Sequence, residues 1–124
     1  MKKVVLVIDK NHGTASLLSS LIKRSNEEIE VEIVDSREST LKYYAGTNDE
    51  IILVIISNDN IRDPEVAMDL RKQGYEGRII AYSGGSEKDW AIMKDDAHFS
   101  FCPKSQKSNA ILMKIAVYTH MTPD

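Results

Sequence analysis

The sequence predicts an α/β fold in which a five-stranded parallel sheet is doubly wound, with helices on both faces. First, five short apolar runs alternate with stretches of helical spacing, which is a (βα)₅ order. Second, the runs at 3–8 and 51–56 are continuously apolar, as expected of parallel strands covered on both faces. Third, 124 residues make one ordinary domain, which we take to span residues 1–124. Short right-handed connections then favour the strand order 2-1-3-4-5.

The predicted strands are rich in Val, Ile and aromatic residues, which strands prefer. In the second run Glu30 and Glu32 alternate with apolar residues, as in a strand at the edge of a sheet. The expected strands are 3–8, 29–34, 51–56, 78–82 and 98–101.

The stretches between the strands carry apolar residues at helical spacing, so each is expected to bury one face of a helix. Asp35 with Glu38, and Ser86 with Asp89, have the spacing of capping boxes at helix starts. Gly74 suits a left-handed C-terminal cap. Five helices are expected, with the apolar stripes Leu17, Leu18, Leu21 and Ile22; Leu41 and Tyr44; Val66, Ala67 and Leu70; Ala91 and Ile92; and Ile111, Leu112, Ile115, Ala116 and Thr119.

The charge and hydropathy of the chain exclude several classes of function. Sixteen basic and 19 acidic residues give a net charge of −3, so no global positive field attracts nucleic acid or an anionic membrane. No apolar run approaches the ~20 residues that span a bilayer, and the single Cys102 cannot form an internal disulfide. We therefore expect a cytoplasmic protein with no membrane or nucleic-acid partner for this chain.

Polar and charged residues follow the apolar strands, where the strands are expected to end. Ligand sites of doubly wound sheets lie at the carboxyl ends of the strands, beside the point where the strand order reverses. We therefore expect a pocket lined by residues from four strand ends: Asp9 and Lys10; Ser57, Asn58, Asp59 and Asn60; Ser83, Gly84, Gly85 and Ser86; and Cys102, Pro103 and Lys104.

Over essentially its whole length the chain resembles the receiver (CheY-like) domains of two-component response regulators. The order of elements agrees, Asp9 ends the first strand, Ser83 ends the fourth before a small residue, and Pro103 follows the fifth. In that family an Asp at the end of the third strand accepts a phosphoryl group, and paired acids after the first strand hold Mg²⁺. A Ser or Thr and a Lys contact the phosphoryl oxygens. The resemblance implies a role in signal transduction.

The motifs of that family match only in part. Asp9 matches the first of the paired acids and Ser83 the Ser or Thr, but Lys10 stands where the second acid would be. Ser57 stands at the acceptor position, and Cys102 takes the position of the Lys. The resemblance therefore implies an atypical receiver, or pseudo-receiver, whose phosphorylation site is degenerate.

Elementary chemistry supports that implication. Mg²⁺ prefers six hard oxygen ligands, so a single acid beside the ammonium of Lys10 makes a poor site. A serine hydroxyl is a weak nucleophile without an adjacent base, and no His falls at these strand ends. We expect the Lys10 ammonium to enter the pocket and pair with Asp9 or Asp59 in place of a metal. No cofactor and no enzymatic activity are then expected.

Two alternatives remain open. A shift of one or two residues in the strand boundary brings Asp59 to the acceptor position, and the chain is then a conventional phosphoacceptor that holds Mg²⁺ with Asp9 and Asp59. A different reading concerns the turn at 83–86, whose glycines and position before a helix suit a phosphorylated ligand but equally suit a tight turn.

Protein contact is the function expected of a receiver without phosphorylation. The resemblance places the contact surface on the fourth helix, fifth strand and fifth helix, where a signalling partner or a second copy would dock. Trp90 and Phe101 are the expected contact residues. For the rings of Phe99 and Phe101 two arrangements remain open, in which either one ring turns outward or both are buried.

Overall fold

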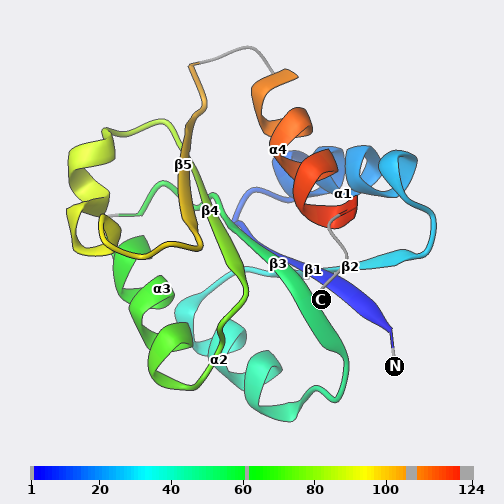
Figure 1. Ribbon diagram of the computed structural model, residues 1–124, viewed down its shortest axis with the longest axis horizontal. Helices are drawn as coiled ribbons and strands as arrows, with labels where there is room; N and C mark the ends of the chain where they lie inside the picture. Colours follow the sequence, from blue (N-terminus) through cyan, green and yellow to red (C-terminus); the bar gives the residue numbers. More distant parts are fainter. Residues whose placement is uncertain (1, 61, 106–108, 121–124) are drawn as a thin grey trace.

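Figure 1 shows a parallel sheet with helices on both faces, in a computed structural model that describes residues 2–60, 62–105 and 109–120. The strands follow the order β2-β1-β3-β4-β5, and every neighbouring pair is parallel. The predicted fold class and strand order are therefore confirmed. The strand bounds are β1 Lys3–Ile8, β2 Ile29–Val34, β3 Glu50–Ile56, β4 Arg78–Ser83 and β5 Phe99–Pro103.

The helices divide between the two faces of the sheet (Figure 1). One face is covered by α1 and α4, and the other by α2, α3 and the short helix η1. The bounds are α1 His12–Ser25, α2 Arg37–Gly46, α3 Asp63–Lys72, η1 Glu87–Met93 and α4 Asn109–His120. In the described part of the chain no helix is long and apolar enough to cross a membrane.

The predicted fourth helix is present but is not an α-helix. It forms a 3₁₀-helix of seven residues, and Trp90 inside it has non-helical φ and ψ of −108° and 17°. The expected apolar stripe of Ala91 and Ile92 is exposed, and Trp90 and Met93 are buried instead. Tight 3₁₀ turns are common in such short connecting pieces. The ring of Trp90 is buried in the core layer on the face of the sheet that η1 covers.

The core consists of two apolar layers, one on each face of the sheet. Successive residues of β1 alternate between them, with Val5 and Val7 in the layer under α1 and α4 and Leu6 and Ile8 in the opposite layer. The continuously apolar runs therefore mark strands buried on both faces, as predicted. Strand β2 lies at the edge, and the side chains of Glu30 and Glu32 are exposed.

Local sequence signals determine where the helices begin and end. The capping box at the start of α2 uses Ser36 and Ser39, so the predicted pair of Asp35 and Glu38 is wrong by one residue. A serine side chain reaches the free amides of the first turn as well as an acid does, which is why spacing alone does not separate the two choices. The predicted box of Ser86 and Asp89 is present at η1, and Gly74 has the expected left-handed φ of 100°.

Trp90 is buried, so the expectation that it forms an exposed contact surface is wrong. Only 4% of Trp90 is exposed, and its ring stacks on Phe99 with the centroids 5.5 Å apart. Phe99 and Phe101 both pack partly against the core layer that contains Trp90, so of the two open arrangements the structure is nearer to the one in which both rings are buried. Residues two apart on a strand point to the same face.

We predict that Trp90→Ala destabilises the fold, because it removes a buried ring and the stack on Phe99. Truncation of a buried Trp typically costs about 3–5 kcal/mol in the free energy of unfolding. Ile92→Ala is the matched control, since Ile92 lies on the same short helix but is 62% exposed, and surface changes cost within about 0.5 kcal/mol. Urea unfolding curves of both variants test this, and equal midpoints would contradict the assigned burial of Trp90.

Candidate functional site

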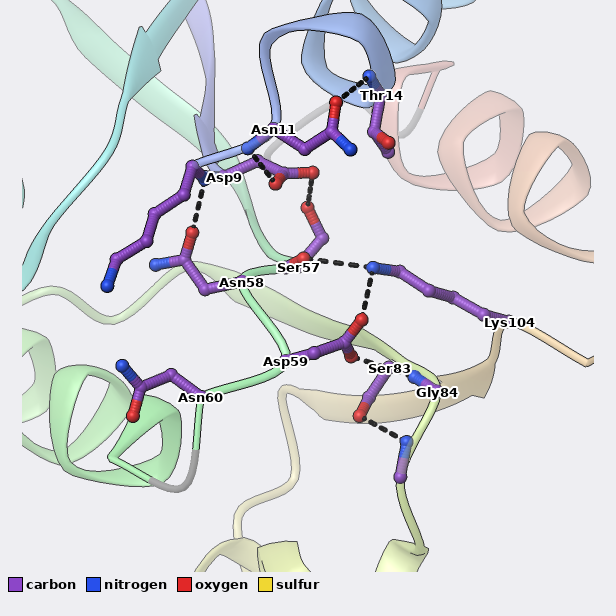
Figure 2. A network of polar contacts seen from close by, with 12 residues as sticks. Asp9, Asn11, Thr14, Ser57, Asn58, Asp59, Asn60, Ser83, Gly84 and Lys104 are labelled. Atoms are coloured by element: carbon purple, nitrogen blue, oxygen red, sulfur yellow. Dashed lines mark hydrogen bonds and ion pairs between the residues drawn. The ribbon is translucent and has the colours of Figure 1, made fainter.

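The carboxyl ends of β1, β3, β4 and β5 bring polar side chains together at one edge of the sheet (Figure 2). This follows from the parallel pairing, because neighbouring parallel strands all end on the same side. The residues joined there are Asp9, Ser57, Asn58, Asp59, Ser83, Gly84 and Lys104.

Asp9 and Ser57 form the buried floor of the site. Each residue is only 2% exposed. The hydroxyl of Ser57 donates to Oδ2 of Asp9 at 2.7 Å, and the backbone N–H of Asn11 donates to Oδ1 at 2.8 Å. Both oxygens of this carboxylate therefore accept a hydrogen bond from the chain itself, which compensates the loss of water around a buried charge.

The carboxylate of Asp59 connects two other strand ends. Lys104 donates from Nζ to Oδ2 of Asp59 at 2.8 Å, and the backbone N–H of Gly84 donates to Oδ1 at 2.8 Å. Lys104 Nζ also donates to the carbonyl oxygen of Ser57 at 2.9 Å. Partial burial on its own raises the pKa of Asp59, but the hydrogen bonds from Lys104 and Gly84 outweigh it and hold the pKa below its ordinary value.

Asp59 makes these contacts from an uncommon backbone conformation. Its φ is 56°, and within the described ranges it is the only non-glycine residue with a positive φ. The left-handed region costs an L-residue roughly 1–2 kcal/mol, although Asp and Asn adopt it more readily than most. The bonds to Lys104 and Gly84 offset this strain, so contacts with other strand ends hold the loop after β3 in place.

The expected ion pair of Lys10 with Asp9 or Asp59 is not formed. The side chain of Lys10 is exposed, and within the described part of the chain the partner of Asp59 is Lys104. Lys10 lies in a bend between the end of β1 and the start of α1. Lys10 contributes its backbone N–H, which donates to Oδ1 of Asn58 at 2.5 Å.

Cys102 does not line the pocket, so its assignment there is wrong. It is 1% exposed and lies in the core layer under α1 and α4, where burial raises the pKa of its thiol. The ammonium comes from Lys104, two residues further along the chain. The N–H of Lys104 donates to the carbonyl of Ser83 at 2.8 Å, so pairing with β4 continues past Pro103 and positions the lysine stem over the pocket.

The backbone amides of the turn at 83–86 donate hydrogen bonds to side chains of this chain. The N–H groups of Gly84, Gly85 and Ser86 donate to the side chains of Asp59, Ser83 and Asp89, respectively. Each amide that a bound phosphate would need is thus already paired, with one acceptor in the turn itself, one in the loop after β3 and one in η1.

An acidic hollow of about 270 Å³ lies beside this turn. It includes Asp63, which the sequence did not single out as a site residue, and burial raises the pKa of that carboxyl. The signal in the sequence was the pair Asp63-Pro64 at a helix start, which also suits an ordinary first turn. The hollow is lined by Asp59, Asn60, Asp63, Pro64, Ser83, Gly85, Asp89 and Trp90.

No protein-family model matches the chain, and a search of curated proteins finds no match. Solved structures do resemble it. The response regulator TrrA from Thermotoga maritima, determined with Mg²⁺ and beryllium fluoride, is 23% identical, with 95% of this chain and 99% of that chain covered and a TM-score of 0.73.

Two further structures show the same likeness. The signal receiver domain of an HD-domain protein from Pseudomonas fluorescens is 15% identical over 96% of this chain and 95% of that one, with a TM-score of 0.78. A CheY-like receiver domain protein from Methanospirillum hungatei is 17% identical over 93% and 91%, with a TM-score of 0.75. The chain therefore has the fold of response-regulator receiver (CheY-like) domains.

Proposed function

We propose that this chain is an atypical receiver domain that acts in signal transduction by contact with another protein, without phosphorylation and without catalysing a reaction. One observation carries the proposal. Both carboxylates of the pocket, Asp9 and Asp59, accept hydrogen bonds from the chain on each of their oxygens. Each oxygen of these two carboxylates thus has a hydrogen-bond donor within the chain.

Ser57, the residue directly after β3, is poorly suited to accept a phosphoryl group. Ser57 is buried, and its hydroxyl hydrogen is directed to Asp9. A serine becomes a strong nucleophile only with an effective general base, and a carboxylate is a far weaker base than an alkoxide. Attack on a phosphodonor would also require the donor to reach a site that the chain itself covers.

The donor set fits Mg²⁺ poorly. A magnesium site needs one or two free carboxylates and room for ordered waters around the ion. Here Asp59 is held by the ammonium of Lys104, and Asp9 is engaged by Ser57 and the backbone N–H of Asn11. A divalent ion at Asp59 would compete with the ammonium of Lys104 for that carboxylate, so we propose that the domain functions without metal.

A second candidate is a conventional phosphoacceptor that uses Asp59 with Mg²⁺ and Asp9. The observation that favours it is the placement of the Asp59 carboxylate between Lys104 and the amide of Gly84, since those groups would also neutralise a phosphoryl group. Asp59 is more accessible than Ser57, with 42% of its side chain exposed. The experiment below separates the two candidates.

The proposed contact surface is formed by η1, β5 and α4. Phe101 remains a candidate on this surface because its ring lines a surface hollow of about 410 Å³ together with residues of η1. Trp90 acts there as a support for the surface, since it is buried beneath it. Exposed apolar side chains on the two flanking helices are Ile92, Met113 and Val117.

Incubation with acetyl phosphate and Mg²⁺ is expected to leave the mass of the protein unchanged, because neither Ser57 nor Asp59 is free to react. Beryllium fluoride with Mg²⁺ is likewise expected to leave the amide NMR spectrum unchanged. The variants Ser57→Ala and Asp59→Asn serve as matched controls. An adduct that persists in Ser57→Ala and disappears in Asp59→Asn would establish the second candidate instead.

The engagement of Asp59 with Lys104 also predicts a pH dependence. Because the folded pKa of Asp59 lies below its unfolded value of about 3.9, the ionised carboxylate stabilises the fold above that pH. The stability difference between wild type and Asp59→Asn is expected within the ~0.2–1 kcal/mol of partly exposed ion pairs. It should be constant near neutral pH and vanish as the pH falls through the folded pKa.

Urea unfolding at a series of pH values measures this difference. Asp95→Asn is the control, since Asp95 is an exposed acid on the same domain. A difference between wild type and Asp59→Asn that persists unchanged at pH values well below the unfolded pKa would contradict the ion pair.

A further inference from the structure

Strand β5 lies at one end of the described sheet and has a strand on one side only. An unpaired strand edge offers backbone N–H and C=O groups to any extended chain that can reach it. The inference below rests on the proposed function, since it concerns the kind of partner that the domain contacts.

The backbone groups on the open side of β5 follow from its pairing with β4. In a parallel strand the N–H and C=O of one residue point to one neighbour, and those of the next residue point the other way. The carbonyl of His98 accepts from Ile79 at 2.9 Å, and the N–H of Lys104 donates to Ser83 at 2.8 Å, so the even-numbered residues face β4. The N–H and C=O of Phe101 therefore face the open edge.

Hollows lie on both sides of this edge. On the side of η1, Phe99 and Phe101 line the hollow of about 410 Å³. On the side of α4, a hollow of about 240 Å³ is lined by Met113, Lys114, Val117 and Tyr118. The hydroxyls of Tyr118 and Ser100 lie 2.8 Å apart, which places the second hollow beside the opposite face of β5.

The first hollow is apolar where Phe99 and Phe101 line it, and the second adjoins β5 at the hydroxyls of Tyr118 and Ser100. Met113 and Val117 are 69% and 55% exposed, which is uncommon for apolar residues one helical turn apart. An added strand would direct alternate side chains to the two faces of the sheet, and hence to the two hollows. The geometry thus matches a period of two residues in the partner.

The charged side chains around the hollows are mostly basic. Lys88 and Lys94 border the first hollow and Lys114 the second, and Glu87 is the acidic exception. The guanidinium of Arg78 lies 4.6 Å from the ring centroid of Tyr118. A second copy of this chain would bring the same cations face to face, so the charges favour an acidic partner.

We infer that β5 receives an extended segment of a partner protein, which adds to the sheet as a sixth strand. The segment has apolar and small polar residues at alternate positions and acidic residues at its ends. Its backbone pairs with Phe101, its apolar side chains enter the hollow beside Phe99 and Phe101, and its small polar side chains face Ser100 and Tyr118.

The probe is a synthetic peptide with alternating valine and threonine flanked by glutamates, titrated into the protein while amide NMR shifts are recorded. We expect saturable binding with the largest shift at the N–H of Phe101. The matched variants are Phe101→Ala and Phe101→Pro. Both lack the phenyl ring, but only Phe101→Ala keeps the backbone N–H at this position. Because that N–H faces away from β4, proline removes no bond of the sheet.

Phe101→Pro is expected to bind the peptide roughly tenfold more weakly than Phe101→Ala. Residue 101 then has no N–H to donate, and the proline ring obstructs the open side of β5. Two altered forms of the probe are titrated into the wild-type protein. One is N-methylated at the backbone amides that would pair with β5, and the other has lysines in place of the flanking glutamates. Each is expected to lose binding. The N-methylated peptide tests the backbone pairing even if Phe101→Pro fails to fold.

Equal affinity of the two variants, equal affinity of the N-methylated peptide, or no saturable binding to wild type would overturn the inference. A concentration-dependent dimer whose interface shifts centre on β5 would also overturn it, since the occupant would then be a second copy. No phosphodonor or Mg²⁺ enters this titration, so its failure is distinct from a failure of the proposed function.

Discussion

The interaction on which the site depends is the hydrogen-bonded ion pair of Lys104 and Asp59. Lys104 joins the end of β5 to the loop after β3, and Asp59 extends the connection to β4 through the amide of Gly84. Three strand ends are thus tied together by groups that belong to the chain. The left-handed backbone of Asp59 shows that this arrangement is maintained against a local preference.

The sheet supplies the precision that this arrangement needs. Central strands β1 and β3 are buried on both faces, so their carboxyl ends are fixed by the core on either side. Asp9 and Ser57 directly follow those two strands, so the core fixes their positions as well. The surface beside η1, by contrast, is not fully covered. The short 3₁₀-helix η1 is anchored by Trp90 and leaves part of Phe101 and the edge of β5 accessible.

The fold could be predicted from the sequence because its signals are local and repeated. Continuous apolar runs identified β1 and β3, and alternation with Glu30 and Glu32 identified the edge strand β2. The site was harder, since a side chain's direction depends on where a strand ends. Lys10 lies in a bend after β1 with its side chain exposed, and Lys104 supplies the ammonium in place of Cys102 because pairing with β4 continues past Pro103. Apolar patterns predict the end of a strand only to within about two to four residues, so they do not distinguish positions one or two residues apart.

The central proposal is that Asp9 and Asp59, whose oxygens all accept hydrogen bonds from the chain itself, do not hold a divalent ion. A titration with Mg²⁺ alone, followed by the side-chain carboxyl ¹³C signals of Asp9 and Asp59, tests it most directly. The account predicts that neither signal shifts in a saturable way and that the Lys104 ammonium remains hydrogen-bonded. A saturable shift of both carboxyl signals, with release of Lys104 from Asp59, would contradict the account.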